Sequence, residues 1–148
     1  MEAEFQSLQK NHTWTLSDLP ADKKPIGCKW VYKVKYKADG TIDKYKARLV
    51  ARGFSQKEGI DYEETFAPTA KMSTIRLVLA LAAQFNWKVH QMDVKSAFLN
   101  GDLQEEVYMT QPPGFKVAGQ EQKVCRLVKA IYGLKQAPRA WYMKMIST

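Results

Sequence analysis

Residues 29–51, KWVYKVKYKADGTIDKYKARLVA, decide the fold more than any other stretch of this chain. Aromatic and aliphatic residues alternate with lysines on both sides of the segment 38–41, which contains Gly40. A period of two is typical of a β-strand that buries one face, and a short glycine-containing turn joins two such strands into a hairpin. We therefore predict a hairpin with strands at 30–37 and 42–51, one face apolar and the other basic.

The basic face of this hairpin holds most of the net charge, which is +8 for 23 Lys and Arg against 15 Asp and Glu. Eight basic residues between 29 and 52 are opposed by Asp39 and Asp43 alone, an excess of six. They are Lys29, Lys33, Lys35, Lys37, Lys44, Lys46, Arg48 and Arg52. Like charges on one strand face repel, and bound phosphates relieve this repulsion. The pattern favours nucleic-acid binding by the hairpin; the alternative is a solvated edge whose lysines block aggregation.

Loops, helices and short strands are expected outside the hairpin. They are a helix at 1–10, a loop at 17–27, an irregular segment at 53–72, a helix at 73–86, strands at 88–94, 107–109 and 123–128, and a helix from 138 to 148. The helix at 73–86 is apolar around most of its circumference, which is typical of a buried helix. This order of elements favours an α+β fold with a layered sheet over a repeating βαβ fold.

The segment WKVHQMDVKSAFLNG, residues 87–101, places Asp93 near the end of an expected strand. A carboxylate beside a turn can hold Mg²⁺, which prefers hard oxygen ligands; the alternative is an aspartate that caps the turn. Phe98 follows five residues later, and pattern alone favours a core aromatic there.

The two cysteines, Cys28 and Cys125, form no CxxC and no zinc-binding spacing, so we expect ordinary reduced thiols. The first residues lack the pattern of a signal peptide, and the longest apolar run, 77–83, is too short to cross a bilayer. These features predict a cytoplasmic or nuclear location and no membrane partner, with an organelle-encoded copy left open.

Three long segments resemble copia-type retrotransposon reverse transcriptases. They are KPIGCKWVYKVKYKADGTIDKYKARLVARGFSQKEGIDYEETFAP at 24–68, VHQMDVKSAFLNGDLQEEVYMTQPPGF at 89–115 and YGLKQAPRAWY at 132–142. Together they cover nearly the whole chain in order. The resemblance implies a partial reverse transcriptase domain over 1–148, within a right-hand polymerase. Residues 24–72 would be fingers-like, and 73–142 palm- and fingers-like.

The resemblance implies templated addition of deoxynucleotides (dNTPs) to a primer, on an RNA or DNA template, with two Mg²⁺ ions clamping the reacting oxygens. Asp93 would be the catalytic metal ligand, assisted by the Val94 carbonyl. Phe98 matches the aromatic gate whose ring would exclude a ribose 2′-OH.

Further residues match the family's nucleotide and nucleic-acid contacts. Lys46 and Arg48 lie in the triphosphate-contacting strand, and which of them meets the triphosphate stays open. Tyr132 and Gly133 match positions near the incoming nucleotide. Contacts to the nucleic-acid backbone are implied for Lys33, Lys35, Lys37, Lys44, Lys135 and Arg139. For Lys135 and Arg139 the alternative is an exposed helix start.

The family's second catalytic block, Tyr-x-Asp-Asp, has no counterpart here, because the chain contains no Asp-Asp dipeptide. The pairs at 63–64 and 105–106 are glutamates that we expect to face water. We therefore expect a fragment of an RNA-directed DNA polymerase from a Pol polyprotein, truncated before that block. Alone, the fragment is expected to be inactive and either unstable or aggregation-prone. Whether it is an enzyme stays open; the alternative is a non-enzymatic nucleic-acid-binding or relic protein.

Overall fold

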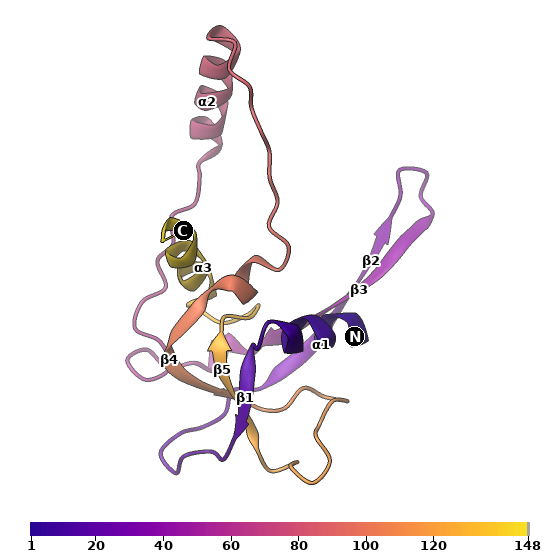
Figure 1. The fold of residues 1–148 in the computed structure, drawn as a ribbon, viewed down its shortest axis with the longest axis vertical. Helices are drawn as coiled ribbons and strands as arrows, with labels where there is room; N and C mark the ends of the chain where they lie inside the picture. Colours follow the sequence, from indigo (N-terminus) through magenta and orange to yellow (C-terminus); the bar gives the residue numbers. More distant parts are fainter. Residues whose placement is uncertain (148) are drawn as a thin grey trace.

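The chain forms two small antiparallel sheets with three helices around them, in a computed structural model that describes residues 1–147 (Figure 1). The end of the expected last helix, Thr148, lies outside the described residues. The elements are α1 (Glu2–Lys10), β1 (Trp14–Ser17), β2 (Cys28–Tyr36), β3 (Ile42–Ala51), η1 (Gly53–Ser55), α2 (Met72–Gln84), η2 (Ala97–Asn100), β4 (Asp102–Met109), β5 (Val124–Lys129) and α3 (Ala137–Ile146). One sheet has the order β1-β5-β4 and the other is β2-β3, so the α+β class is confirmed.

The predicted hairpin is confirmed as the pair β2-β3, whose register shifts at one bulge after Lys35. Gly40 has a φ of 82°, a left-handed conformation that glycine adopts without steric cost. Asp39 accepts hydrogen bonds from the Thr41 amide at 2.9 Å and hydroxyl at 2.6 Å. These bonds hold the pKa of Asp39 below its usual range. The turn end of the hairpin projects from the body of the molecule (Figure 1).

The inner end of the hairpin packs on the three-stranded sheet and shares one core with it. The Ile26 amide donates to the Tyr108 carbonyl at 2.8 Å, and the Thr110 amide donates to the Ile26 carbonyl at 2.9 Å. Buried core residues come from both sheets, α1, η2, the loop before β2, and the segment that leads into the start of α3: Leu8, Ile26, Cys28, Leu49, Ala51, Leu99, Val107, Met109, Cys125, Leu127, Ala130, Ile131, Leu134 and Ala137. Since this core holds the base of β3 beside residues 130–137, it positions the candidate site described below.

Both cysteines are free and buried, as expected for structural thiols. Burial raises the pKa of the Cys125 thiol to about 12, and the neighbouring Cys28 adds to this. Burial also raises the pKa of Cys28. Both groups therefore stay protonated at neutral pH and fill space in the core.

Most of the other expected elements are present. Helices α1 and α3 and strand β5 match the expected segments, while β4 begins five residues before the expected 107. The short strand β1 was not predicted. It pairs with β5 from Trp14 opposite Leu127 to Ser17 opposite Val124, a partner more than a hundred residues away. None of the described helices combines the length and apolarity that a membrane span needs.

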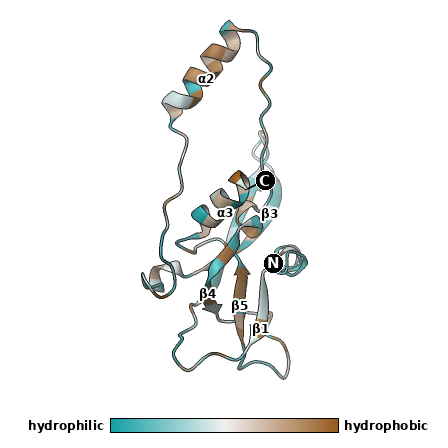
Figure 2. Cartoon of the chain, turned by 60° about the vertical axis from the view of Figure 1, so that its left-hand side comes forward, coloured by the Kyte–Doolittle hydropathy of each residue, from teal (hydrophilic) through white to brown (hydrophobic). Residues whose placement is uncertain are grey.

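Helix α2 is exposed, so the prediction of a buried helix was wrong. Leu77, Val78 and Leu79 are 61%, 52% and 48% exposed, and Ala82 is the one buried residue of the helix. The helix stands at one end of the molecule on two extended segments, with apolar residues on several sides (Figures 1 and 2). Its composition still favours burial, but no described element lies against it to supply the cover.

The prediction of a strand at 88–94 was also wrong. This segment descends from α2 to η2 in an extended conformation, and within residues 1–147 it pairs with no strand (Figure 1). Val89, Met92 and Val94 are 57%, 89% and 48% exposed. Alternating apolar residues favour a strand only where a neighbouring strand supplies hydrogen bonds and cover.

Polar substitutions in α2 are expected to suppress self-association. Ile75 and Leu79 are 42% and 48% exposed and lie one turn apart. Ile75→Glu with Leu79→Lys removes two large apolar surfaces and adds a favourable i,i+4 ion pair. We expect the variant to stay monomeric in sedimentation velocity at a concentration at least about tenfold above that at which the wild type associates.

The matched control is Ile75→Leu with Leu79→Ile, which keeps the apolar surface and should associate like the wild type. Association of the Glu/Lys variant at the wild-type concentration would show that α2 is not the adhesive surface.

Candidate nucleotide and nucleic-acid site

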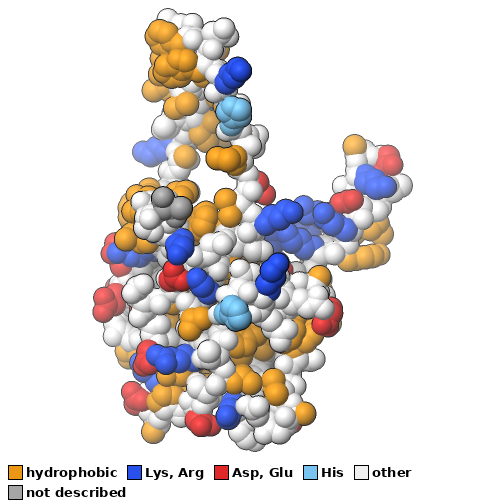
Figure 3. Space-filling view, viewed as in Figure 1, with side chains coloured by type: hydrophobic (Ala, Val, Ile, Leu, Met, Phe, Trp, Pro, Cys, Tyr) orange, Lys and Arg blue, Asp and Glu red, His pale blue; other side chains and the backbone are white. Residues whose placement is uncertain are grey.

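The register of the hairpin places six cations on one face. Directly opposed residues of an antiparallel pair share a face, and Lys33 lies opposite Lys46 while Lys35 lies opposite Lys44. The six are Lys29, Lys33, Lys35, Lys44, Lys46 and Arg48. Blue side chains gather along the hairpin in Figure 3. The predicted basic face is confirmed as a geometric feature; Lys37 lies beyond the bulge, where its amide donates to the Thr41 carbonyl at 2.8 Å.

Three predicted nucleotide contacts from separate parts of the sequence meet at the base of this face. The Arg48 guanidinium carbon lies 4.9 Å from the centre of the Tyr132 ring, within cation–π range. The Phe98 and Tyr132 ring centres are 4.9 Å apart and 65° inclined, an edge-to-face contact. All three side chains are half-buried. The cluster joins β3, η2 and the loop after β5 into one surface.

Gly133 allows the loop after β5 to lie directly against β3. Its φ is 92°, and a Cβ there would lie 2.2 Å from the Ala51 carbonyl oxygen. The Ala51 amide donates to the Tyr132 carbonyl at 2.8 Å. Gly53 is equally close from the other side, since its Cβ would lie 2.0 Å from the Gly133 carbonyl oxygen. Two glycines therefore make the contact that positions Tyr132.

A buried glutamine pair, which sequence reasoning missed, fastens the same loop to residues 56–62. Gln56 donates from Nε2 to Gln136 Oε1 at 2.9 Å, and Gln136 donates to the Asp61 carbonyl at 2.9 Å. Gln56 Oε1 also accepts the Lys135 amide at 2.9 Å. Both side chains are almost fully buried. Buried polar groups need hydrogen-bond partners, and these bonds supply them. No periodicity marks them; the available signal is that Gln56 and Gln136 each lie in a segment resembling the family.

The predicted nucleic-acid contacts Lys135 and Arg139 are both engaged within the chain. Lys135 Nζ donates to the Gln56 carbonyl at 3.2 Å and to the Tyr62 hydroxyl at 3.1 Å, and it lies 4.7 Å from the Tyr62 ring centre. Arg139 forms an ion pair with Glu64 at 2.7 Å. Lys135 precedes α3 and Arg139 lies in its first turn, and both side chains already have partners within the chain.

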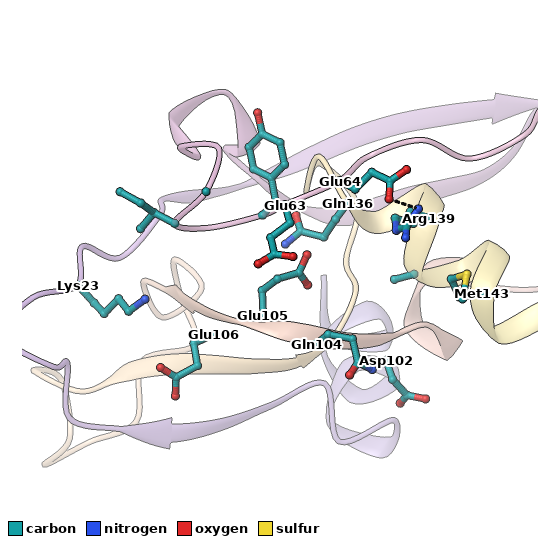
Figure 4. Close-up of a pocket in the computed structure, with 14 residues that line it drawn as sticks. Lys23, Glu63, Glu64, Asp102, Gln104, Glu105, Glu106, Gln136, Arg139 and Met143 are labelled. Carbon is teal, nitrogen blue, oxygen red and sulfur yellow. Dashed lines mark ion pairs between the residues drawn. The ribbon is translucent and has the colours of Figure 1, made fainter.

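The Arg139 ion pair borders a pocket of about 610 Å³ between the 59–64 loop, β4 and α3. The carboxyl groups of Glu63 and Glu105 point toward one another across it (Figure 4). At its edge, hydrogen bonds from Lys129 and Lys144 hold the pKa of Asp102 below its usual range. Glutamate pairs expected to face water thus share one acidic pocket, brought together by loop packing that no sequence pattern indicates.

The carboxylate of Glu4 in α1 lies beside the base of the basic face. Burial raises its pKa, while the charges of Lys46 and Arg48 and the Leu49 amide act in the opposite direction. The Glu4 carboxylate therefore already interacts electrostatically with Lys46 and Arg48, the two candidate triphosphate contacts.

The predicted metal ligands Asp93 and Val94 lie in the exposed, unpaired segment before η2. Among residues 1–147, no group of three or more His, Cys, Asp or Glu side chains is placed to hold a metal ion. One carboxylate and one carbonyl are fewer ligands than a two-metal site needs, so these residues do not by themselves fit the implied pair of Mg²⁺ ions.

Residues 11–148 match the protein family described as reverse transcriptase (RNA-dependent DNA polymerase). The chain belongs to the reverse transcriptase family. It is 56% identical over 99% of its length to the retrovirus-related Pol polyprotein from transposon TNT 1-94 of Nicotiana tabacum. It is 50% and 49% identical, each over 98% of its length, to the corresponding polyproteins from transposons RE2 and RE1 of Arabidopsis thaliana. The resemblance to copia-type retrotransposon reverse transcriptases is thereby confirmed.

This reverse transcriptase chain spans only about a tenth of those relatives, 11%, 10% and 10% of their respective lengths. The family assignment therefore concerns one segment of a retrotransposon Pol polyprotein. No solved structure matches the chain.

Proposed function

We propose that this chain supplies the nucleotide-facing fingers and part of the palm of a right-hand reverse transcriptase, with residues 24–72 fingers-like and 73–142 palm- and fingers-like. In the complete polyprotein this part would help add deoxynucleotides to a primer on an RNA or DNA template. The observation that carries the proposal is the contact of Arg48, Tyr132 and Phe98 at the base of a six-cation strand face.

Arg48 is the better candidate for the triphosphate contact than Lys46. Its guanidinium lies over the Tyr132 ring, beside Phe98, so a phosphate bound there would lie next to the proposed nucleotide pocket. Lys46 lies one row farther along the hairpin, opposite Lys33. A planar guanidinium also binds phosphate oxygens in a bidentate manner, which an ammonium group cannot do.

Phe98 is the proposed gate against ribonucleotides. Its ring is half-buried and its edge-to-face contact with Tyr132 limits its movement. A ring fixed in this way presents an apolar wall to a ribose 2′-OH, which would clash or lose its hydrogen bonds. Gly133 contributes by bringing the backbone beside Tyr132 close to β3.

Reverse transcriptases as a family use a divalent metal. Asp93 and the Val94 carbonyl are the proposed ligands from this chain, and the remaining ligands would come from other parts of the Pol polyprotein. The exposed position of Asp93 leaves its carboxylate accessible to such a partner. We place the assembled protein in the cytoplasm or the nucleus, where two unpaired buried thiols are the usual state.

Reversing three charges on the basic face is expected to reduce the salt dependence of nucleic-acid binding. Lys35, Lys44 and Lys46 all lie on this face. Each lost phosphate contact lowers the slope of log K against log salt by about 0.9 on duplex DNA, so the triple change to Glu should lower it by about 2.7. Fluorescence anisotropy of a labelled primer–template between about 50 and 200 mM salt measures this slope.

The matched control reverses Lys10, Lys24 and Lys116, which are exposed outside the hairpin. Both triple variants have a net charge of +2, because three Lys-to-Glu changes remove six charges from +8. Equal losses in the two variants would mean that net charge alone attracts the nucleic acid and that the hairpin is not the binding face.

A further inference from the structure

The face of the hairpin opposite the lysines has one tyrosine in each of three successive rows. Tyr32 lies opposite Ala47, Tyr45 opposite Val34, and Tyr36 opposite Ile42. Rows on one face of a strand are about 6.6–6.8 Å apart, so the three rings form a regular series along the projecting part of the hairpin.

These tyrosines are exposed although they lie on the face predicted to be buried. Tyr32, Tyr36 and Tyr45 are 65%, 64% and 76% exposed. Among the described residues none of the three rings stacks on another aromatic ring, and the Tyr32 hydroxyl donates to Met1 Sδ at 3.0 Å. Trp30, one row closer to the body, is packed against Phe115 with its ring nitrogen bonded to the Pro113 carbonyl. The core therefore ends at Trp30, and the aromatic series continues into solvent.

Lysines border this aromatic face. A cavity of about 310 Å³ lies between the hairpin and Met1. Its hairpin lining includes Tyr32, Val34 and Tyr45, together with Lys33 and Lys46, whose backbone positions are on the other face. Hydrophobic side chains follow one border of the hairpin beside its lysines and arginines (Figure 3). Aromatic rings flanked by cationic side chains are the usual components of a surface that binds single-stranded nucleic acid.

We propose that Tyr32, Tyr45 and Tyr36 stack on unpaired bases of single-stranded nucleic acid, while Lys33, Lys46 and the neighbouring lysines contact its phosphates. Stacking accepts any base, because every base has a π-face, so the surface would hold template of any sequence. Charge complementarity selects this occupant: six cations on the same two strands favour a polyanion over an apolar protein segment. The inference rests on the proposed nucleic-acid binding and assigns a second face of the hairpin to it.

The test compares a single-stranded oligodeoxynucleotide of about 12 nucleotides with an abasic strand that has the same number of phosphates. In fluorescence anisotropy, the wild type should bind the base-containing strand at least about fivefold more tightly, the low end of the contribution of one stacked base. Tyr36→Ile with Tyr45→Ile keeps strand propensity and apolar character but removes two rings. Because Tyr32 remains, this variant should lose most, but not all, of the preference for the base-containing strand, and it should bind the abasic strand with wild-type affinity.

Phe66→Ile is the matched control, since Phe66 is 70% exposed and lies outside the hairpin, and it should bind like the wild type. Equal wild-type affinity for the two strands would overturn base stacking while leaving phosphate binding, and hence the proposed function, intact. If the tyrosine variant also loses affinity for the abasic strand, the tyrosines have a structural role, and base stacking is overturned. Absence of binding to either strand would overturn both proposals.

Discussion

Replacing Gly133 with Ala is expected to lower the free energy of unfolding by about 3 kcal/mol or more. A non-glycine residue at a φ of 92° is strained, which costs about 1–2 kcal/mol. The added Cβ would also lie 2.2 Å from the Ala51 carbonyl oxygen and 2.7 Å from Val50 Cγ1. The loop cannot withdraw without breaking the hydrogen bond from the Ala51 amide to the Tyr132 carbonyl. Urea unfolding followed by tryptophan fluorescence measures the change.

Gly119→Ala separates the two causes of this loss. Gly119 has a similar φ of 76°, but a Cβ there would have no neighbour within 4 Å. It should therefore incur only the conformational cost, about 1–2 kcal/mol. Equal destabilisation by the two substitutions would show that the close approach of the 131–134 loop to β3 contributes nothing, and would remove the argument for how Tyr132 is positioned.

The hairpin could be predicted from the sequence because the information that specifies it is local. Alternating residues determine which side chains share a face, and the turn at 38–41 determines the register, so the cationic face followed from residues 29–51 alone. The exposure of Tyr32, Tyr36 and Tyr45 did not follow, because alternation predicts a common face without predicting what covers it. Strand β1 was not predicted for a related reason, since the segment WTLS pairs only with the distant β5.

Two further wrong predictions, the buried helix and the strand at 88–94, also depend on packing partners. Apolar periodicity in α2 and alternation around Asp93 indicate what these segments require, and residues 1–147 do not provide it. The candidate site was predictable only as a set of separate residues. Resemblance named Arg48, Phe98 and Tyr132, but their mutual contacts depend on the Gln56 and Gln136 hydrogen bonds and on Gly133, which bring distant loops together.

Replacing Asp93 with Asn is expected to abolish DNA synthesis in a polyprotein that contains this chain. The proposed role of Asp93 is to hold the metal that stabilises the attacking and leaving oxygens, and the amide of asparagine is a weaker, neutral ligand. A loss of about a thousandfold or more is expected. Because Asp93 is exposed and unpaired with any strand, the substitution should leave the folding stability unchanged. Asp22→Asn, at another exposed aspartate, is the control and should preserve the rate.

The suitable protein is the Nicotiana tabacum Pol polyprotein with its matching segment, 56% identical over 147 residues, replaced by this chain. The unaltered polyprotein serves as the positive control. Primer extension on an RNA template with Mg²⁺ is then measured for the chimera and for its Asp93→Asn and Asp22→Asn variants. We predict extension by the chimera and by Asp22→Asn, and none above background by Asp93→Asn. Extension that persists in Asp93→Asn, or an inactive chimera beside an active parent, would contradict the proposal that this chain forms the nucleotide-facing part of a reverse transcriptase.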